Sequence, residues 1–187
     1  MGGEGDPVTT GPFRFISVVQ PGQPSDFRVR LAINVAGRLV QANRGLRRRF
    51  RELSPRLPTR PEATSALALT PYDASPWGVT SAGFRNRLEG WAPGGLHNRV
   101  HTWVGGDMLP STSPNDPVFY LHHCNVDRLW EAWMVQHGRT YLPAQNAPAS
   151  LNGHRINDVM NSLVSAPLRI ADVLDLSGIF TYDSLAP

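Results

Sequence analysis

The stretch SPNDPVFYLHHCNVDRLWEAWMVQHG, Ser113 to Gly138, predicts the longest element of the chain. Its polar start can cap helix N–H groups, and Pro117 suits a first helical turn, where no backbone donor is needed. No helix-breaking residue follows until Gly138. We therefore expect a helix from Pro117 to His137, about 30 Å long at ~1.5 Å per residue.

Shorter elements are expected upstream of this helix. Partly alternating apolar and polar residues in 26–41 predict a short strand or a hairpin around Gly37. A helix start is expected at Pro61, a short helix at 84–90 that closes on a glycine, and another within 94–104. Together these patterns predict a mainly α fold with long irregular loops and a few short strands.

The composition favours a globular protein over a disordered or membrane-spanning one. The 187 residues are 41% hydrophobic and 18% charged, and no apolar run reaches the ~18 residues that span a bilayer. The N-terminus lacks the basic start and apolar core of a signal peptide, so a cytoplasmic location, or export with a partner, is expected. Residues 1–187 are expected to form one region without internal repeats.

Basic residues are concentrated between Arg44 and Arg56, and every basic residue of the chain is an arginine. Such a cluster could bind nucleic acid or an acidic partner. Acidic residues elsewhere reduce the net charge to +3. A solvated surface is therefore the favoured interpretation, and neither nucleic acid nor a membrane is an expected partner.

Two histidines four residues apart, His97 and His101, point to metal chemistry. Residues at i and i+4 project from one helix face with Cβ atoms about 5–6 Å apart, near enough to share an ion. The spacing alone is weak evidence, because it is common among ordinary histidines. The long helix adds the adjacent His122 and His123. Antiparallel packing of the two helices would complete a three-imidazole site with an open position.

Helical periodicity does not decide which of His122 and His123 would bind. His122 continues the stripe that starts at Val118, and His123 continues that of Phe119, about 100° further round. Adjacent side chains diverge too far for both to bind one ion easily. One should therefore be a ligand, and the other a buried neighbour that makes hydrogen bonds.

The available donor atoms limit the choice of metal. Cys124 is the only cysteine, which excludes a thiolate-rich zinc or iron–sulfur site. Neutral imidazoles suit zinc or copper. A zinc peptidase would carry glutamate directly after the first histidine, where this chain has Asn98, and this counts against a zinc hydrolase. A zinc-bound water held by three histidines remains an alternative.

Four motifs together resemble the bacterial tyrosinases of the type-3 copper protein family. They are FRNRLEGW (84–91), LHNRVHTWVGGDM (96–108), SPNDPVFYLHHCNVDRLWEAW (113–133) and FTYD (180–183). The resemblance implies the second copper-binding, C-terminal half of such an enzyme, and part of a four-helix-bundle domain. In that family two copper ions, each held by three histidines, bind dioxygen. The enzymes oxidise phenols to o-diphenols and then to o-quinones, as in melanin biosynthesis.

The resemblance also assigns the metal ligands. His97, His101 and His123 correspond to the ligands of the second copper, which makes His122 the hydrogen-bonding neighbour. For Asp127 two roles stay open: anchoring a ligand imidazole, or pairing with an arginine. Met108 to Pro110 correspond to the loop that borders the substrate entrance.

Glu89 and Asn98 match a catalytic pair that, in the bacterial enzymes, orients a water able to take the phenol proton. A phenol with a pKa of about 10 must become phenolate to coordinate copper, and a positioned carboxylate–amide pair makes such a water basic. The alternative for Glu89 is a surface ion pair with Arg85 or Arg87. Cys124 is expected to be a small buried thiol.

One departure from the family pattern concerns the first copper. Its three histidines have no counterpart here, because the remaining His137 and His154 form no second pair at helical spacing. We therefore expect one copper ion per chain. The expected partners are a phenolic substrate, dioxygen, and either the missing first-copper half or a copper-delivery partner protein. The alternatives are a mononuclear three-histidine metal-binding protein without turnover, a non-functional truncated fragment, or an oxygen carrier of the hemocyanin kind.

Overall fold

The computed structural model describes residues 2–15, 27–90, 95–160, 166–175 and 177–187. They fall into two compact units, each built from two segments of chain. Unit 1 comprises Met1–Leu57 and His97–Cys124, and unit 2 comprises Pro58–Leu96 and Asn125–Pro187. In the described part of the chain, four α-helices accompany two small two-stranded sheets, which confirms the mainly α prediction. None of these helices is long and apolar enough to cross a bilayer.

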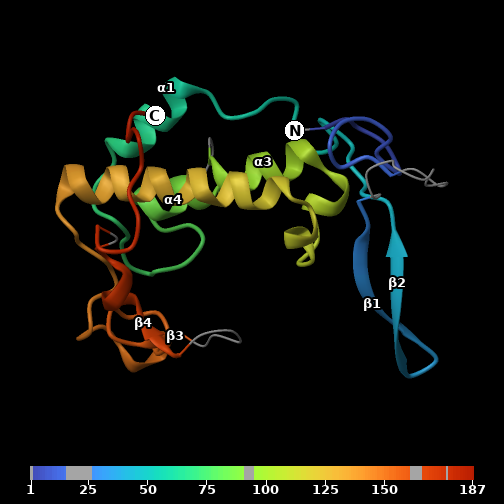
Figure 1. Cartoon of the computed structure of the whole chain (residues 1–187). Helices are drawn as coiled ribbons and strands as arrows, with labels where there is room; N and C mark the ends of the chain where they lie inside the picture. The colour runs from blue at the N-terminus through green and yellow to red at the C-terminus, as the bar shows by residue number, and fades with distance from the viewer. Residues whose placement is uncertain (1, 16–26, 91–94, 161–165, 176) are drawn as a thin grey trace. The chain divides into compact units, whose positions relative to one another are not determined.

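A β-hairpin forms part of unit 1, as expected around Gly37 (Figure 1). Its strands are β1 (Val29–Val35) and β2 (Arg38–Arg44). Ala36 and Gly37 join them with positive φ angles of 50° and 83°, the combination that a tight two-residue hairpin turn needs. The exposure of one face rises along β1, from 1% at Val29 to 52% at Val35. The base of the hairpin is therefore part of the core, and its tip is exposed.

The arginine cluster is only partly a solvated surface, so that interpretation was wrong for two of its residues. Arg48 is buried and donates to Asp116 through Nε at 2.8 Å and Nη2 at 2.6 Å. Arg44 pairs with Asp107. Each buried carboxylate also accepts a backbone N–H, so the charges are compensated and the usual cost of burying them is offset.

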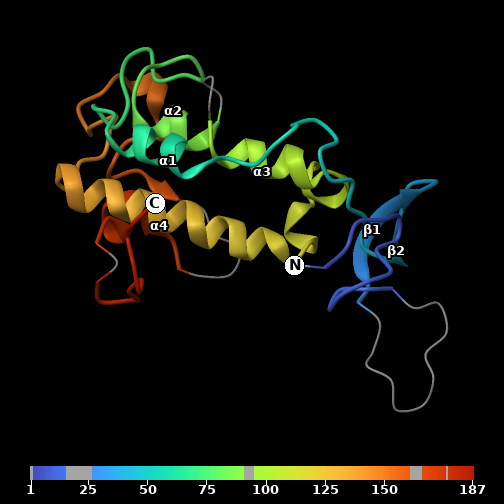
Figure 2. The same ribbon diagram turned by 90° about the horizontal axis from the view of Figure 1, so that it is seen from above.

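α4 (Val118–His137) runs unbroken and appears in Figure 2 as one continuous helix. The expected bounds were right to within one residue. Asp116 Oδ1 accepts the Val118 N–H at 2.9 Å, and Gly138, with φ 76°, follows the last turn. Residues up to Cys124 belong to unit 1, and the rest of the helix belongs to unit 2.

Unit 2 has its own apolar core around α4, α1 (Arg60–Leu67) and α2 (Phe84–Glu89). Trp133 of α4 stacks on Phe84 with ring centroids 5.0 Å apart, and its Nε1 donates to the Leu69 carbonyl at 2.7 Å. Gly90 ends α2 in a left-handed conformation, φ 102°, which an L-residue disfavours. The expected helix at 84–90 is thereby confirmed.

Short elements complete the described chain. They are η1 (Gly106–Met108), η2 (Ser113–Asn115), η3 (Ala149–Leu151), β3 (Val159–Met160), β4 (Leu168–Arg169) and η4 (Ile170–Val173).

A C-terminal segment lies along the unit 2 part of α4. The Tyr182 hydroxyl donates to Asp127, and Arg128 donates to the carbonyls of Ser184 and Ala186. The Asp127 carboxylate thus accepts from a tyrosine of the FTYD motif, a partner that neither expected role included. Cys124 is exposed, contrary to the expectation of a buried thiol. It lies about 200° round the helix from His122, away from that buried stripe.

Candidate metal centre

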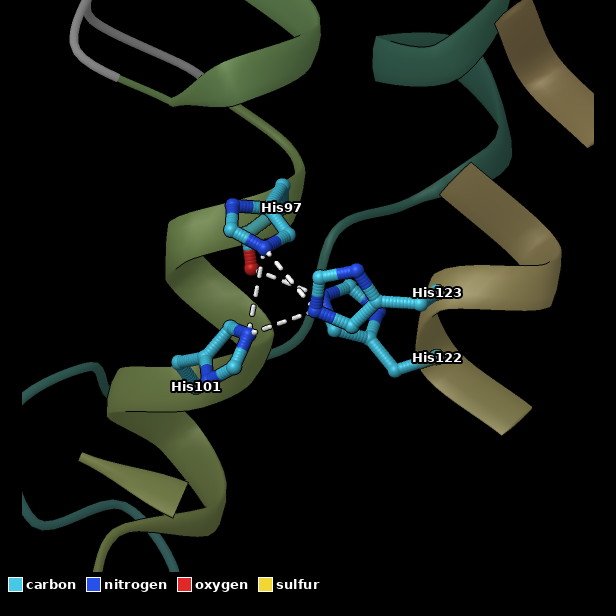
Figure 3. Close-up of side chains that lie close together, drawn as sticks. All are labelled: His97, His101, His122 and His123. Carbon is cyan, nitrogen blue, oxygen red and sulfur yellow. Dashed lines mark hydrogen bonds between the residues drawn. The ribbon is translucent and has the colours of Figure 1, made fainter. Parts of the chain in front are cut away.

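Four imidazoles meet within unit 1 (Figure 3). α3 (His97–Val104) presents His97 and His101, one turn apart, and the start of α4 presents His122 and His123 toward them. One ligand-capable nitrogen from each lies within 4.8 Å of the others. The two sequence motifs, 22 to 26 residues apart, therefore come together as a single cluster.

Three of the imidazoles point the same nitrogen at a common centre. The Nε2 atoms of His97, His101 and His123 are 3.1, 3.3 and 3.3 Å apart. The centre of such a triangle lies about 1.9 Å from each corner, close to the ~2.0–2.1 Å of a bond between a metal ion and an imidazole nitrogen. These three nitrogens could therefore hold one metal ion. This donor set fits copper or zinc.

A backbone carbonyl fixes the tautomer of His101. Its Nδ1 lies 2.7 Å from the carbonyl oxygen of Met108. A carbonyl can only accept, so Nδ1 must carry the hydrogen, and in the neutral ring Nε2 then carries the lone pair. The hydrogen bond thus turns the metal-binding face of this imidazole toward His97 and His123.

His122 has the opposite arrangement. Its Nε2 lies 3.0 Å from the carbonyl oxygen of His97, so this nitrogen must donate. The ring also stacks on that of His97, with centroids 5.1 Å apart and planes 12° apart. His122 therefore holds the start of α3, while His123 is the α4 histidine whose Nε2 faces the other two rings.

The electrostatics keep the α4 histidines neutral. Burial is the main cause and the neighbouring imidazoles add to it: together they lower the pKa of His122 to about 3 and that of His123 to about 4. Both rings are thus uncharged at neutral pH. A metal ion needs a neutral imidazole, so it would not have to displace the proton of a charged ring at His123.

Aromatic and apolar side chains surround the cluster within unit 1. Phe119 stacks on His123, with ring centroids 3.9 Å apart and planes 25° apart. Val104, Met108 and Val118 form a small core against which Phe119 also packs. Trp103 packs against this core and stacks on Phe50 with ring centroids 4.8 Å apart.

The predicted catalytic pair is placed on two separate elements. Glu89 is the last residue of α2 in unit 2, and Asn98 is the second residue of α3 in unit 1; both are half-buried. Arg85, one suggested ion-pair partner of Glu89, bonds to Asp73 at 2.6 Å. The joint role of Glu89 and Asn98 stays a prediction.

Sequence reasoning missed the group that orients His101. The Met108 carbonyl is a backbone atom, and nothing in the identity of residue 108 indicates that its oxygen would accept from an imidazole. The preceding glycine pair, Gly105 and Gly106, was the available signal, because both adopt positive φ and turn the chain back at the end of α3.

Comparison with known proteins gives a consistent family assignment. The family model described as the common central domain of tyrosinase matches residues 2–136, which include all four clustered histidines. A tyrosinase of Streptomyces lincolnensis is 42% identical over 180 residues, covering 95% of this chain and 58% of the relative. A tyrosinase of Streptomyces glaucescens is 46% identical over 140 residues, covering 74% of this chain and 49% of the relative.

A third relative carries a different name. Grixazone synthase of Streptomyces griseus subsp. griseus is 39% identical over 211 aligned positions, covering 98% of this chain and 65% of the relative. The chain thus spans about half to two thirds of the length of these relatives. The matched domain and the histidine cluster that it contains lead to one assignment: the chain belongs to the tyrosinase family, whose members depend on copper.

Proposed function

We propose that the chain binds one copper ion through Nε2 of His97, His101 and His123, as the second copper site of a tyrosinase-type oxidase. The observation that carries this proposal is the convergence of these three atoms, 3.1 to 3.3 Å apart, around a point at bonding distance from each. Copper bound there would supply the redox chemistry with dioxygen. The family membership supports copper over zinc.

The substrate class we propose is phenolic: monophenols for o-hydroxylation and o-diphenols for oxidation to o-quinones. In this proposal Glu89 and Asn98 hold a water molecule that accepts the phenol proton. Their residue types suit the task, because a carboxylate accepts a hydrogen bond and an amide can both donate and accept. His122 keeps α3 in place through the His97 carbonyl.

The complete reaction requires a second copper and three further histidines. We propose that the first-copper half supplies them, on a segment or partner that joins this chain, and that a copper-delivery protein can assist loading. Among the described residues outside the cluster, His137 bonds to the Leu67 carbonyl at 2.7 Å and His154 lies in a loop. Neither adds to the cluster.

Metal stoichiometry and affinity test the proposed site. We expect one copper ion per chain, and loss of that ion in His97→Ala, His101→Ala and His123→Ala. His154→Ala is the matched control, because it removes an imidazole in unit 2 and should leave binding unchanged. Undiminished copper binding in all three ligand variants would overturn the proposed site.

Oxygen consumption tests the proposed activity. The chain joined to the first-copper half of a Streptomyces relative should consume dioxygen with a monophenol or an o-diphenol. Glu89→Gln should slow the reaction with monophenol more than the reaction with o-diphenol if the water takes the phenol proton. Tight binding of one copper with no turnover in that assembly would favour the second candidate, a mononuclear metal-binding protein, which the self-contained cluster in unit 1 also suits.

A further inference from the structure

The carboxylate of Asp107 connects the turn after α3 to the end of β2 by hydrogen bonds. Asp107 accepts from both terminal nitrogens of Arg44, through Oδ2 at 2.7 Å and through Oδ1. Its Oδ2 also accepts the backbone N–H of Arg47 at 2.8 Å, and its own N–H donates to the Arg47 carbonyl at 2.9 Å. Four hydrogen bonds thus hold one residue of the turn.

The two residues before Asp107 are glycines, so the turn depends on these hydrogen bonds to keep one conformation. Gly105 and Gly106 adopt φ angles of 65° and 54°, a region open to glycine, whose backbone has more freedom than any other residue. A Cβ on Gly106 would lie 2.4 Å from the Arg47 carbonyl oxygen, so the two backbones approach too closely for a side chain. A flexible glycine pair needs an external constraint to hold one geometry.

The residue after Asp107, Met108, links this turn to the histidine cluster through a hydrogen bond. Met108 is fully buried, and its carbonyl oxygen accepts the Nδ1–H of His101 at 2.7 Å. Only one peptide unit separates this carbonyl from Asp107, which the four hydrogen bonds hold in place. The position of the acceptor therefore depends on the ion pair, and the tautomer of His101 depends on the acceptor.

We propose that Arg44 and Asp107 are positioning residues for the metal centre: their ion pair holds the Met108 carbonyl where it selects the Nδ1–H tautomer of His101. This inference rests on the proposed function, since His101 is there a metal ligand through Nε2. The bidentate, charge-assisted contact suits such a role, because it is stronger and more directional than a neutral hydrogen bond.

The test compares the same change, arginine to glutamine, at two positions three residues apart. Arg44→Gln removes the guanidinium that binds Asp107. Arg47→Gln is the matched control: its guanidinium bonds to Asp6 at 2.7 Å on the surface, and its backbone N–H to Asp107 remains. Asp107→Asn keeps an acceptor for that N–H but loses the charge, so it provides a milder variant should Arg44→Gln fail to fold.

The first measurement is the tautomer of His101 in the metal-free chain at fixed pH, read from two-bond 1H–15N correlations of the imidazole. The second is copper affinity by competition with a chelator. In wild type and Arg47→Gln we expect the Nδ1–H tautomer. In Arg44→Gln and Asp107→Asn we expect a shift toward Nε2–H and an affinity lower by about 10- to 100-fold, the usual effect of removing such support.

A merely structural role would lower stability without moving the tautomer. Unchanged tautomer populations and equal copper affinities in Arg44→Gln, Asp107→Asn and Arg47→Gln would therefore overturn the inference. The proposed function fails by a different result, namely undiminished copper binding in all three variants His97→Ala, His101→Ala and His123→Ala. The tautomer measurement needs no metal, so the two failures remain distinguishable.

Discussion

At the residue scale, neighbouring histidines of α4 have different tasks. His123 turns Nε2 toward His97 and His101, whereas His122 uses its Nε2 hydrogen to bond to a carbonyl. The difference follows from what each nitrogen faces: a lone pair can bind a metal ion, and an N–H cannot.

Substitution of each α4 histidine by glutamine should separate these tasks. His123→Gln should remove one of three ligands and abolish stoichiometric copper binding. His122→Gln keeps an N–H donor near the His97 carbonyl, so it should retain one ion per chain, with affinity lower by no more than about 10- to 100-fold. Competition titrations followed by metal analysis would measure both. Loss of the ion in His122→Gln with retention in His123→Gln would reverse the assignment.

At the element scale, α4 contributes to a histidine cluster at one end and to an apolar core at the other. The unit 2 part of the helix buries Leu129, Trp133 and Met134. Burial of these side chains supplies the hydrophobic free energy that keeps this part of the helix in place.

Trp133 makes the largest single contribution to that core by volume. Trp133→Ala should lower the free energy of unfolding by about 3–5 kcal/mol, because it leaves a cavity and removes the partner of the Leu69 carbonyl. Trp133→Phe should cost less, since a ring still stacks on Phe84. Urea denaturation followed by circular dichroism would measure the difference. Ser65→Ala, at an exposed position of α1, is a control of small expected effect; equal losses in all three variants would contradict this view of the core.

The sequence predicted elements well where a local pattern determines them. The hairpin turn at Gly37, the end of α2 at Gly90 and the bounds of α4 all depend on residues a few positions apart. The buried Arg48–Asp116 pair spans 68 positions, and no local pattern reveals which of several arginines finds the carboxylate. The histidines were predictable as a cluster, but the carbonyl that orients one of them was not.

At the scale of the whole molecule, stability should fall in alkaline solution. Burial raises the pKa of the Tyr72 hydroxyl, which lies in the unit 2 core beside Tyr141, whose pKa burial also raises. The folded state therefore favours the neutral phenols. Their contribution is fully present below the ordinary tyrosine pKa of about 10, and it is lost as the pH rises above that value.

Tyr72→Phe should reduce this alkaline loss. The variant cannot ionise at position 72, so its free energy of unfolding should fall less between pH 8 and pH 11 than that of wild type, with Tyr141 leaving a residual slope. Urea titrations at both pH values would measure this. Tyr120→Phe is the control, because it removes an exposed hydroxyl that lies outside the unit 2 core. Identical slopes in wild type and Tyr72→Phe would exclude Tyr72 as a source of the effect.

The exposed hairpin tip also bears on how the chain behaves at high concentration. In the described part of the chain, β1 and β2 pair only with each other, so the outer edge of each strand presents backbone donors and acceptors that another chain could extend into a larger sheet. Ile33 and Val40, opposite each other and more than 40% exposed, would favour such addition. Arg30 of β1 and Arg38 of β2 are exposed and oppose it, because a copy approaching either strand would bring like charges together. We therefore expect the arginines of the hairpin to limit association between copies.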